Sequence, residues 1–133
     1  MTPVFLDTVG LLALWDKSDQ WHSAATTAFD QIVSMRRSVL TSSYVLLECA
    51  NAAARRPYRF DVIDLRDELM SSGLVYEPTA VEIEAAWGEY GRGSATAPGI
   101  VDLVSFQIMH RLQIQDAFTN DRHFKAFGFQ ALF

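Results

Sequence analysis

The chain has 133 residues, a length typical of one compact domain, and we expect residues 1–133 to form a single domain. Hydrophobic residues make up 50% of it and charged residues 20%, a balance that excludes intrinsic disorder. No apolar run approaches the roughly 20 residues of a membrane span, and the first residues lack the basic region and cleavage site of a signal peptide. With a single cysteine, Cys49, in an apolar stretch, the sequence predicts a cytoplasmic protein without disulfides and without a membrane partner.

The formal net charge is −5, from 16 acids and 11 bases. This charge disfavours a nucleic-acid partner, because such proteins usually present a basic surface. The argument loses force if several of the acids converge on a bound cation, since a local basic rim can then still hold phosphate. The placement of the acids, more than their number, therefore decides the class of ligand.

Along the chain, short apolar runs alternate with stretches of helical spacing. The predicted strands are 3–7, 38–42, 74–78 and 117–120. The first predicted helix begins at residue 11. The other predicted helices cover residues 22–37, 42–56, 60–72, 79–93, 100–114 and 122–127. Pro57 and Gly73 end the third and fourth helices, and Thr79 with Glu82 forms a capping box at the start of the fifth. This alternation favours a mainly parallel sheet with helices on both faces, in which binding sites form beyond the carboxyl ends of the strands.

Two acids in the first half of the chain stand among apolar residues. Asp7 directly follows the first strand, where a turn residue or a helix cap is the structural alternative. Glu48 lies in the middle of a helix whose other faces are apolar. With Tyr44, Asn51 and Arg55 it forms a polar stripe at helical spacing, which fits either a solvent-exposed face or one wall of a cleft.

Two further acids occur in the second half. Asp102 lies near the start of an apolar helix, where a carboxylate also complements the positive end of the helix dipole. Ser105 shares its face one turn later, so its hydroxyl can orient the carboxylate or contact a bound water. Asp121 follows the last strand and also fits the cap of the short helix after it. Each acid taken alone has a structural explanation.

Four carboxylates in one cleft need a compensating positive charge, because each close pair repels by about 1 kcal/mol in water and by more when partly buried. Oxygen ligands without a cluster of histidines or cysteines suit Mg²⁺ or Mn²⁺. His22, His110 and His123 show no metal-ligand spacing, so we assign them surface or packing roles and consider a zinc site unfavoured.

These residues resemble the PIN domain, and within it the VapC-like toxin nucleases of toxin–antitoxin pairs. The resemblance covers nearly the whole chain. It is carried by "VFLDT" with Asp7 and Thr8, "SSYVLLECANAA" with Glu48, "VDLVSF" with Asp102 and Ser105, and "FTNDRHF" with Asp121. The chain departs from the family pattern at Val9 and Gly10, where another small polar residue is common, and at "PGIVD", where a hydroxyl residue often precedes the third acid.

The resemblance implies a PIN-like three-layer α/β/α fold with a short, mainly parallel sheet of four to five strands. It implies that four acids form the catalytic, metal-binding cluster for Mg²⁺ or Mn²⁺, namely Asp7, Glu48, Asp102 and Asp121. The implied supporting polar shell is Thr8, Ser105 and Asn120. Phe124 and Phe127 would pack into the core, and His123 would lie near the rim. The implied partners are an RNA substrate, a small antitoxin protein and a second copy of the chain in a homodimer.

The resulting hypothesis is metal-dependent hydrolysis of RNA phosphodiester bonds, which leaves 5'-phosphate and 3'-hydroxyl ends. Five arginines are candidates for contacts with backbone phosphates: Arg55, Arg56, Arg59, Arg92 and Arg122. The alternative is a protein-binding module with weak or lost catalysis, in which exposed Trp21, Phe60 and Trp87 would form a dimer or antitoxin surface. A phosphotransferase with Asp7 as nucleophile is a third reading, disfavoured because Val9 stands where a second acid is expected.

Overall fold

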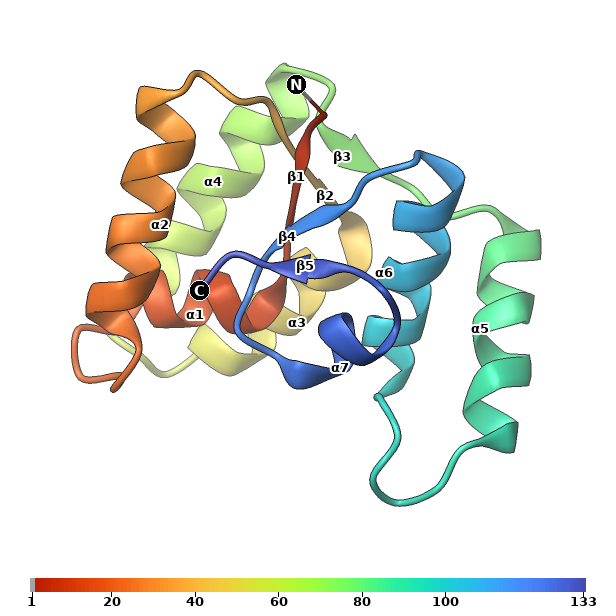
Figure 1. Ribbon diagram of the computed structural model, residues 1–133. Coiled ribbons are helices and arrows are strands. Elements are labelled where there is room, and N and C mark those ends of the chain that lie inside the picture. The colour runs from red at the N-terminus through yellow and green to blue at the C-terminus, as the bar shows by residue number, and fades with distance from the viewer. Residues whose placement is uncertain (1) are drawn as a thin grey trace.

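The computed structural model describes residues 2–133, which form seven helices around a five-stranded sheet (Figure 1). All strands are parallel, and their order across the sheet is β3-β2-β1-β4-β5. The strands are β1 Val4–Leu6, β2 Val39–Ser42, β3 Val75–Tyr76, β4 Asp116–Phe118 and β5 Gln130–Ala131. The predicted α/β class and parallel sheet are thereby confirmed. The first four strands fall at their predicted positions, whereas β5 was not assigned from the sequence.

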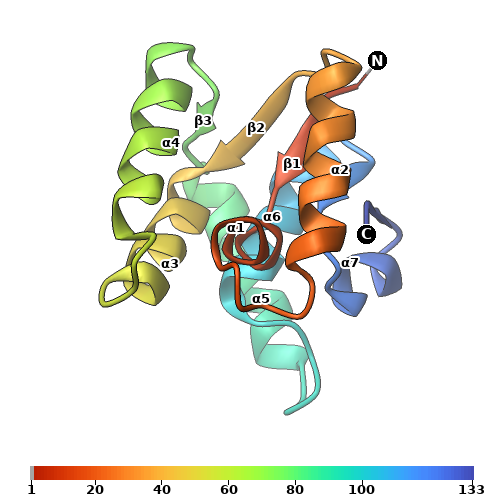
Figure 2. The same cartoon turned by 90° about the vertical axis from the view of Figure 1, so that its left-hand side faces the viewer.

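Helices cover both sides of the sheet, with α2 on one side and α5 and α6 on the other (Figures 1 and 2). The helices are α1 Thr8–Trp15, α2 His22–Ser34, α3 Ser43–Ala53, α4 Arg59–Ser71, α5 Ala80–Arg92, α6 Ile100–Arg111 and α7 Arg122–Ala126. The predicted capping box of α5 is present, because Thr79 and Glu82 bond reciprocally. Of the helices formed by residues 2–133, none combines the length and apolar character needed to cross a membrane.

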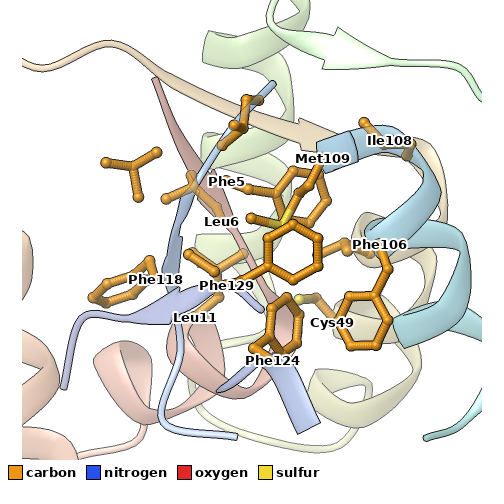
Figure 3. Close-up of a cluster of buried hydrophobic side chains, with 14 of the residues drawn as sticks. Phe5, Leu6, Leu11, Cys49, Phe106, Ile108, Met109, Phe118, Phe124 and Phe129 are labelled. Carbon is orange, nitrogen blue, oxygen red and sulfur yellow. The ribbon is translucent and has the colours of Figure 1, made fainter. Parts of the chain in front are cut away.

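Phenylalanine side chains from several elements pack into the hydrophobic core (Figure 3). Phe5 of β1 and Phe118 of β4 are fully buried, and Phe124 of α7 packs edge-on against Phe106 of α6 with ring centroids 4.8 Å apart. The burial of Phe124 was predicted correctly. Phe127, which was also predicted to pack into the core, is 38% exposed, although its ring stacks on the buried Phe106 with centroids 4.7 Å apart. Phe129 takes the buried position instead, since the positive φ of Gly128 (90°) turns the chain back toward the sheet.

The strand order indicates where a ligand would bind, at the middle of the sheet. From β1 the chain builds outward through β2 and β3, and it then crosses over to build β4 and β5 on the other side of β1. In such a sheet, ligands bind beyond the carboxyl ends of the two strands where the direction of building reverses. Those strands are β1 and β4. Asp7 and Asp121 follow them, and both therefore lie at this end of the sheet.

Candidate metal centre

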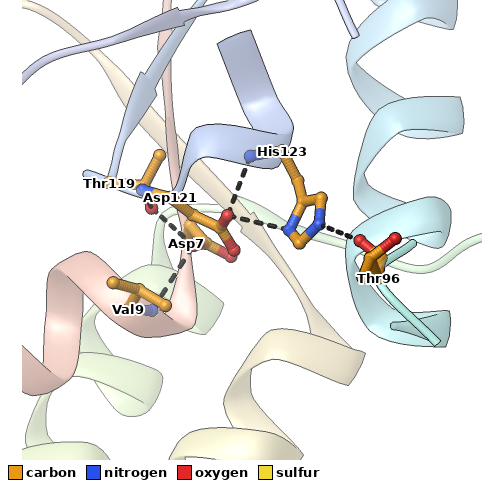
Figure 4. Close-up of polar contacts among 6 residues, drawn as sticks. All are labelled: Asp7, Val9, Thr96, Thr119, Asp121 and His123. Atoms are coloured by element: carbon orange, nitrogen blue, oxygen red, sulfur yellow. Dashed lines mark hydrogen bonds and ion pairs between the residues drawn. The ribbon is translucent and has the colours of Figure 1, made fainter. Parts of the chain in front are cut away.

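Asp7 begins the site. It is the N-cap of α1, which starts at Thr8, three residues earlier than predicted; its Oδ2 accepts a long hydrogen bond from the Val9 amide, at 3.4 Å. The same Oδ2 accepts a shorter one, at 2.8 Å, from the hydroxyl of Thr119 just after β4 (Figure 4). The other oxygen, Oδ1, is buried and has no hydrogen-bond partner among the described residues. The Asp7 carboxylate can therefore cap α1 and belong to a cluster of acids at the same time.

Thr119 joins the two strand ends. Its hydroxyl donates to Asp7 and accepts from the backbone amide of Asp121 at 3.1 Å (Figure 4). Sequence reasoning missed this residue and assigned the supporting role to its neighbour Asn120, which is half-buried. The signal that could have found it is a hydroxyl residue immediately after the strand and two positions before the acid, because alternate side chains of an extended segment point to the same side.

Glu48 reaches the cluster from α3. Its Oε1 accepts a hydrogen bond of 2.5 Å from the hydroxyl of Thr8, so two residues that are 40 positions apart are joined across the seam between α1 and α3. Thr8 was predicted to support the acids, and in the structure its hydroxyl contacts one of them, Glu48. Oε2 of Glu48 remains available, because Glu48 is exposed at the surface of α3.

Asp102 and Asp121 approach from α6 and α7. One ligand atom each from Asp102, Asp121 and His123 lies within 4.8 Å of the others. Asp121 caps α7, and its Oδ1 accepts from both the amide and the ring Nδ1 of His123, at 2.9 and 3.0 Å. His123 was predicted to lie near the rim in a surface or packing role, and in the structure its ring also contacts an acid of the cluster.

The His123 ring also connects this cluster to the loop before α6. Its Nε2 lies 2.9 Å from the carbonyl oxygen of Thr96 (Figure 4). These two contacts tie the loop that leads into the Asp102 helix to the site.

Ser105 does not orient Asp102 in the way the sequence suggested. It is fully buried, and its hydroxyl donates at 3.0 Å to the carbonyl of Val101, one turn back in its own helix. This local bond is common for serine in helices.

The electrostatics of the cluster show how strongly the acids are crowded. Burial, together with the negative charge of Asp102, raises the pKa of Asp7 to about 8. Burial, together with the charges of Asp121 and Glu48, raises the pKa of Asp102 to about 6. Burial is the largest cause of both shifts, and the negative charges of the neighbouring acids add to it.

The donor set fits a divalent cation. A buried carboxylate oxygen without a partner, with Asp102 and Asp121 also near this carboxylate, is costly to leave uncompensated, because a buried charge needs a counter-charge or a metal. All four side chains offer oxygen, which Mg²⁺ and Mn²⁺ prefer. His123 lies at the edge of this set, with both ring nitrogens taken up by Asp121 and the Thr96 carbonyl.

The five arginines proposed as phosphate contacts differ in their surroundings. Three are engaged locally: Arg56 with Asp16, Arg59 with the carbonyl of Ala54, and Arg92 with Glu89. Arg55 and Arg122 are exposed. Arg55 lies in the turn just after α3, the helix that carries Glu48, and Arg122 directly follows Asp121, so these two lie nearest to the cluster along the chain.

Replacing Thr119 with valine is expected to weaken binding of Mn²⁺ by roughly 10- to 100-fold, the usual cost of removing a group that orients a ligand. Valine keeps the volume of threonine and removes the only hydroxyl that holds both Asp7 and the Asp121 amide in the described structure. Calorimetric titration with Mn²⁺ measures the change. Thr26→Val is the matched control, because the Thr26 hydroxyl bonds only within α2, to the carbonyl of His22. Equal affinities for the two variants would contradict the role of Thr119.

Among the comparisons with known proteins, the one with solved structures gives a match. No protein-family model matches the sequence, and no curated protein matches it. The structure is similar to that of VapC20 of Mycobacterium tuberculosis, a toxin that cleaves the sarcin-ricin loop, with a TM-score of 0.79 and 28% sequence identity. The match covers 96% of each chain. The resemblance to PIN-domain, VapC-like toxins is thereby confirmed.

Proposed function

We propose that this chain, whose fold and sequence resemble those of a VapC-like PIN-domain toxin, is a cytoplasmic endoribonuclease that depends on Mg²⁺ or Mn²⁺. The observation that carries the proposal is the convergence of Asp7, Glu48, Asp102 and Asp121 beyond the ends of β1 and β4, with Oδ1 of Asp7 buried and unpartnered. The similarity to a toxin that cleaves RNA supports the same reaction class.

In this proposal Asp7, Asp102 and Asp121 hold the cation. A divalent cation at this place supplies a lowered pKa for the attacking water and charge stabilisation for the phosphate. Thr119 positions Asp7 and the backbone of Asp121, and His123 fixes the rotamer of the Asp121 carboxylate. These contacts matter because small misplacements of the reacting groups are costly.

Glu48 is proposed as a further ligand or as the acceptor that positions the attacking water. Since Oε1 accepts from Thr8, Oε2 is the oxygen free to take the proton of the water. The water oxygen bonds to phosphorus while the bond to the 3' oxygen breaks, so the products carry 5'-phosphate and 3'-hydroxyl ends. Arg55 and Arg122 are the best placed of the five arginines to hold the neighbouring phosphates.

The proposed protein partners are a small antitoxin and a second copy of the chain. Exposed apolar residues support such partners, since Trp21, Phe60 and Trp87 are 46%, 67% and 51% exposed. An apolar groove of about 570 Å³ also runs between α3 and α4, lined by Leu46, Leu47, Val62, Ile63 and Met70 among others. The same surfaces support the alternative function, a protein-binding module with weak catalysis.

Cleavage of end-labelled structured RNA, with Mg²⁺ or Mn²⁺ and with a chelator, tests the proposal. We expect the wild type to cut only with metal, and Asp102→Asn to cut slower by roughly 10²- to 10⁴-fold, the usual contribution of a positioned catalytic group. Asp30→Asn is the matched control, because Asp30 is an exposed carboxylate on α2. No cleavage by the wild type of several RNA pools, together with no metal binding, would favour the protein-binding module.

A further inference from the structure

A pocket lies at the end of α1 that is remote from the carboxylate cluster. It has a volume of about 470 Å³, within the usual range for small-molecule sites, and its walls include Trp15, Asp16, Arg56, Tyr58 and Asp61. These residues come from the end of α1, the turn after α3 and the start of α4. None of them takes part in the metal centre.

The seam between α1 and α3 connects this pocket to the cluster. At one end of the seam Thr8 bonds to Glu48, and at the other end Arg56 pairs with Asp16 at 3.0 Å. Both contacts join residues 40 positions apart, and Figure 2, which views α1 nearly end-on, shows α3 beside it at an angle. Along α1 the two contacts are eight residues apart, from Thr8 to the C-cap Asp16, a distance of about 12 Å.

A polar stripe follows the same path on α3. Glu48 and Asn51 are exposed and three residues apart, so they share a row on the surface of α3, and the exposed Arg55 follows in the turn after the helix ends at Ala53. The row begins at the cluster, and Arg55 after it is next to the pocket residue Arg56. An RNA strand whose phosphate lies at the cluster would thus meet hydrogen-bonding groups and a positive charge before it reaches the pocket.

The chemistry of the pocket suits a base better than a phosphate. Its charged side chains balance, because Arg56 and Lys17 are matched by Asp16 and Asp61. The Arg56 guanidinium lies over the ring of Tyr58, 5.6 Å from its centroid, and the ion pair with Asp16 holds it there. Unpaired RNA bases stack on aromatic rings and on guanidinium planes, and carboxylates accept hydrogen bonds from their N–H groups.

We propose that this pocket binds an unpaired base of the RNA a few nucleotides from the bond that is cut, with Tyr58 and Arg56 as the stacking platform. This inference rests on the proposed ribonuclease function. It assigns to α1 and α3 a second task, which is to fix the register of the RNA on the cluster. The pocket would thereby contribute to the choice of cleavage site.

The test is a binding measurement that does not need cleavage. In an Asp102→Asn background, the affinity for a short fluorescent single-stranded RNA of mixed sequence is measured for three further changes: Tyr58→Leu, Arg56→Gln and Tyr90→Leu. Loss of a stacking platform is expected to weaken binding about 10-fold or more for Tyr58→Leu and Arg56→Gln. Tyr90→Leu serves as the control, because Tyr90 is an exposed aromatic on α5, outside the pocket.

A second readout separates a binding role from a merely structural one. The binding affinities are compared for a series of RNAs, each of which lacks the base at one position. At one of these positions, loss of the base should weaken binding to the parent protein but leave binding to Tyr58→Leu nearly unchanged. Arg56→Gln covers the case in which Tyr58→Leu fails to fold, since the Arg56 side chain is 47% exposed. If the wild type cleaves RNA and both variants bind RNA with unchanged affinity, the proposed role of the pocket is wrong and the ribonuclease proposal stands. Failure of the parent to bind RNA, with no cleavage by the wild type, would overturn both.

Discussion

Replacing Asp7 with asparagine is expected to stop RNA cleavage and, at the same time, to stabilise the metal-free protein. The loss of activity should be roughly 10²- to 10⁴-fold, because a positioned charged group of the proposed site is removed. The gain in stability follows from the surroundings of Asp7, which is 1% exposed and lies near Asp102 and Asp121. Asparagine keeps an oxygen that accepts from Thr119, and its amide can donate where Oδ1 now lacks a partner.

The sign of the stability change follows from the pKa of Asp7. Burial and neighbouring negative charges raise this pKa from 3.8 to about 8, so between these pH values the folded state holds a proton that the unfolded state has released. The contribution of Asp7 to the stability of the metal-free wild type is therefore fully present below about pH 4, and it is lost as the pH rises to 8. Asp102, with a pKa raised to about 6, acts in the same direction up to that pH.

Thermal unfolding in a chelator at pH 5 and pH 8 measures the effect. A pKa shift of one unit corresponds to about 1.4 kcal/mol of stability. If Asp7→Asn relieves only one unit of the Asp7 shift, the Tm of the variant at pH 8 should still rise by roughly 4 °C. The difference between variant and wild type should be smaller at pH 5. Added Mg²⁺ should raise the Tm of the wild type and change that of the variant less. A lower Tm for the variant at pH 8 in the chelator would show that the acids are not crowded in this way.

Gly10→Ala is expected to unfold the protein or to destabilise it by about 3 kcal/mol or more, at the upper end of the cost of overpacking. A methyl group at Gly10 would lie 2.1 Å from the carbonyl oxygen of Phe118 and 2.7 Å from its carbonyl carbon. These are backbone atoms of the central sheet, so they cannot rotate away. The first turn of α1 would have to move off β4, and this movement would separate Asp7 from Thr119.

Gly91→Ala is the control for this prediction. Gly91 also lies in a helix, but no atom lies within 4 Å of the position of an added Cβ. The change should stabilise the protein by about 0.5–1 kcal/mol, the usual gain of alanine over glycine in a helix. Chemical denaturation of both variants gives the free energies of unfolding. If Gly10→Ala were as stable as Gly91→Ala, the close approach of α1 to β4 would be refuted.

The pair Val9–Gly10 also shows why one departure from the family pattern has a structural reason. The sequence alone marked it as a change near the site. In the structure, Gly10 is the residue that lets α1 touch the backbone of β4, and this contact brings Asp7 within 2.8 Å of Thr119. The approach is a matter of packing between segments more than 100 residues apart, so no local pattern could reveal it.

The sequence by itself determined the secondary structure and the order of the elements. Alternation of apolar runs with helical spacing located four strands and seven helices, and Pro57, Gly73 and Thr79 marked helix ends, because hydrophobic periodicity and capping act over a few residues. The same local signals singled out the four acids, since each interrupts an apolar segment. They could not place β5, whose two residues form a strand only by pairing with β4.

Only the tertiary structure decided which polar residues meet these acids. Thr119 and His123 contact Asp7 and Asp121, whereas Ser105 bonds to its own helix and Asn120 is only half-buried. These contacts depend on the side to which each side chain points and on the crossover that makes β1 and β4 neighbours. Hydrogen bonds form over about 3 Å, a precision that comes from packing across the whole chain and not from spacing along it.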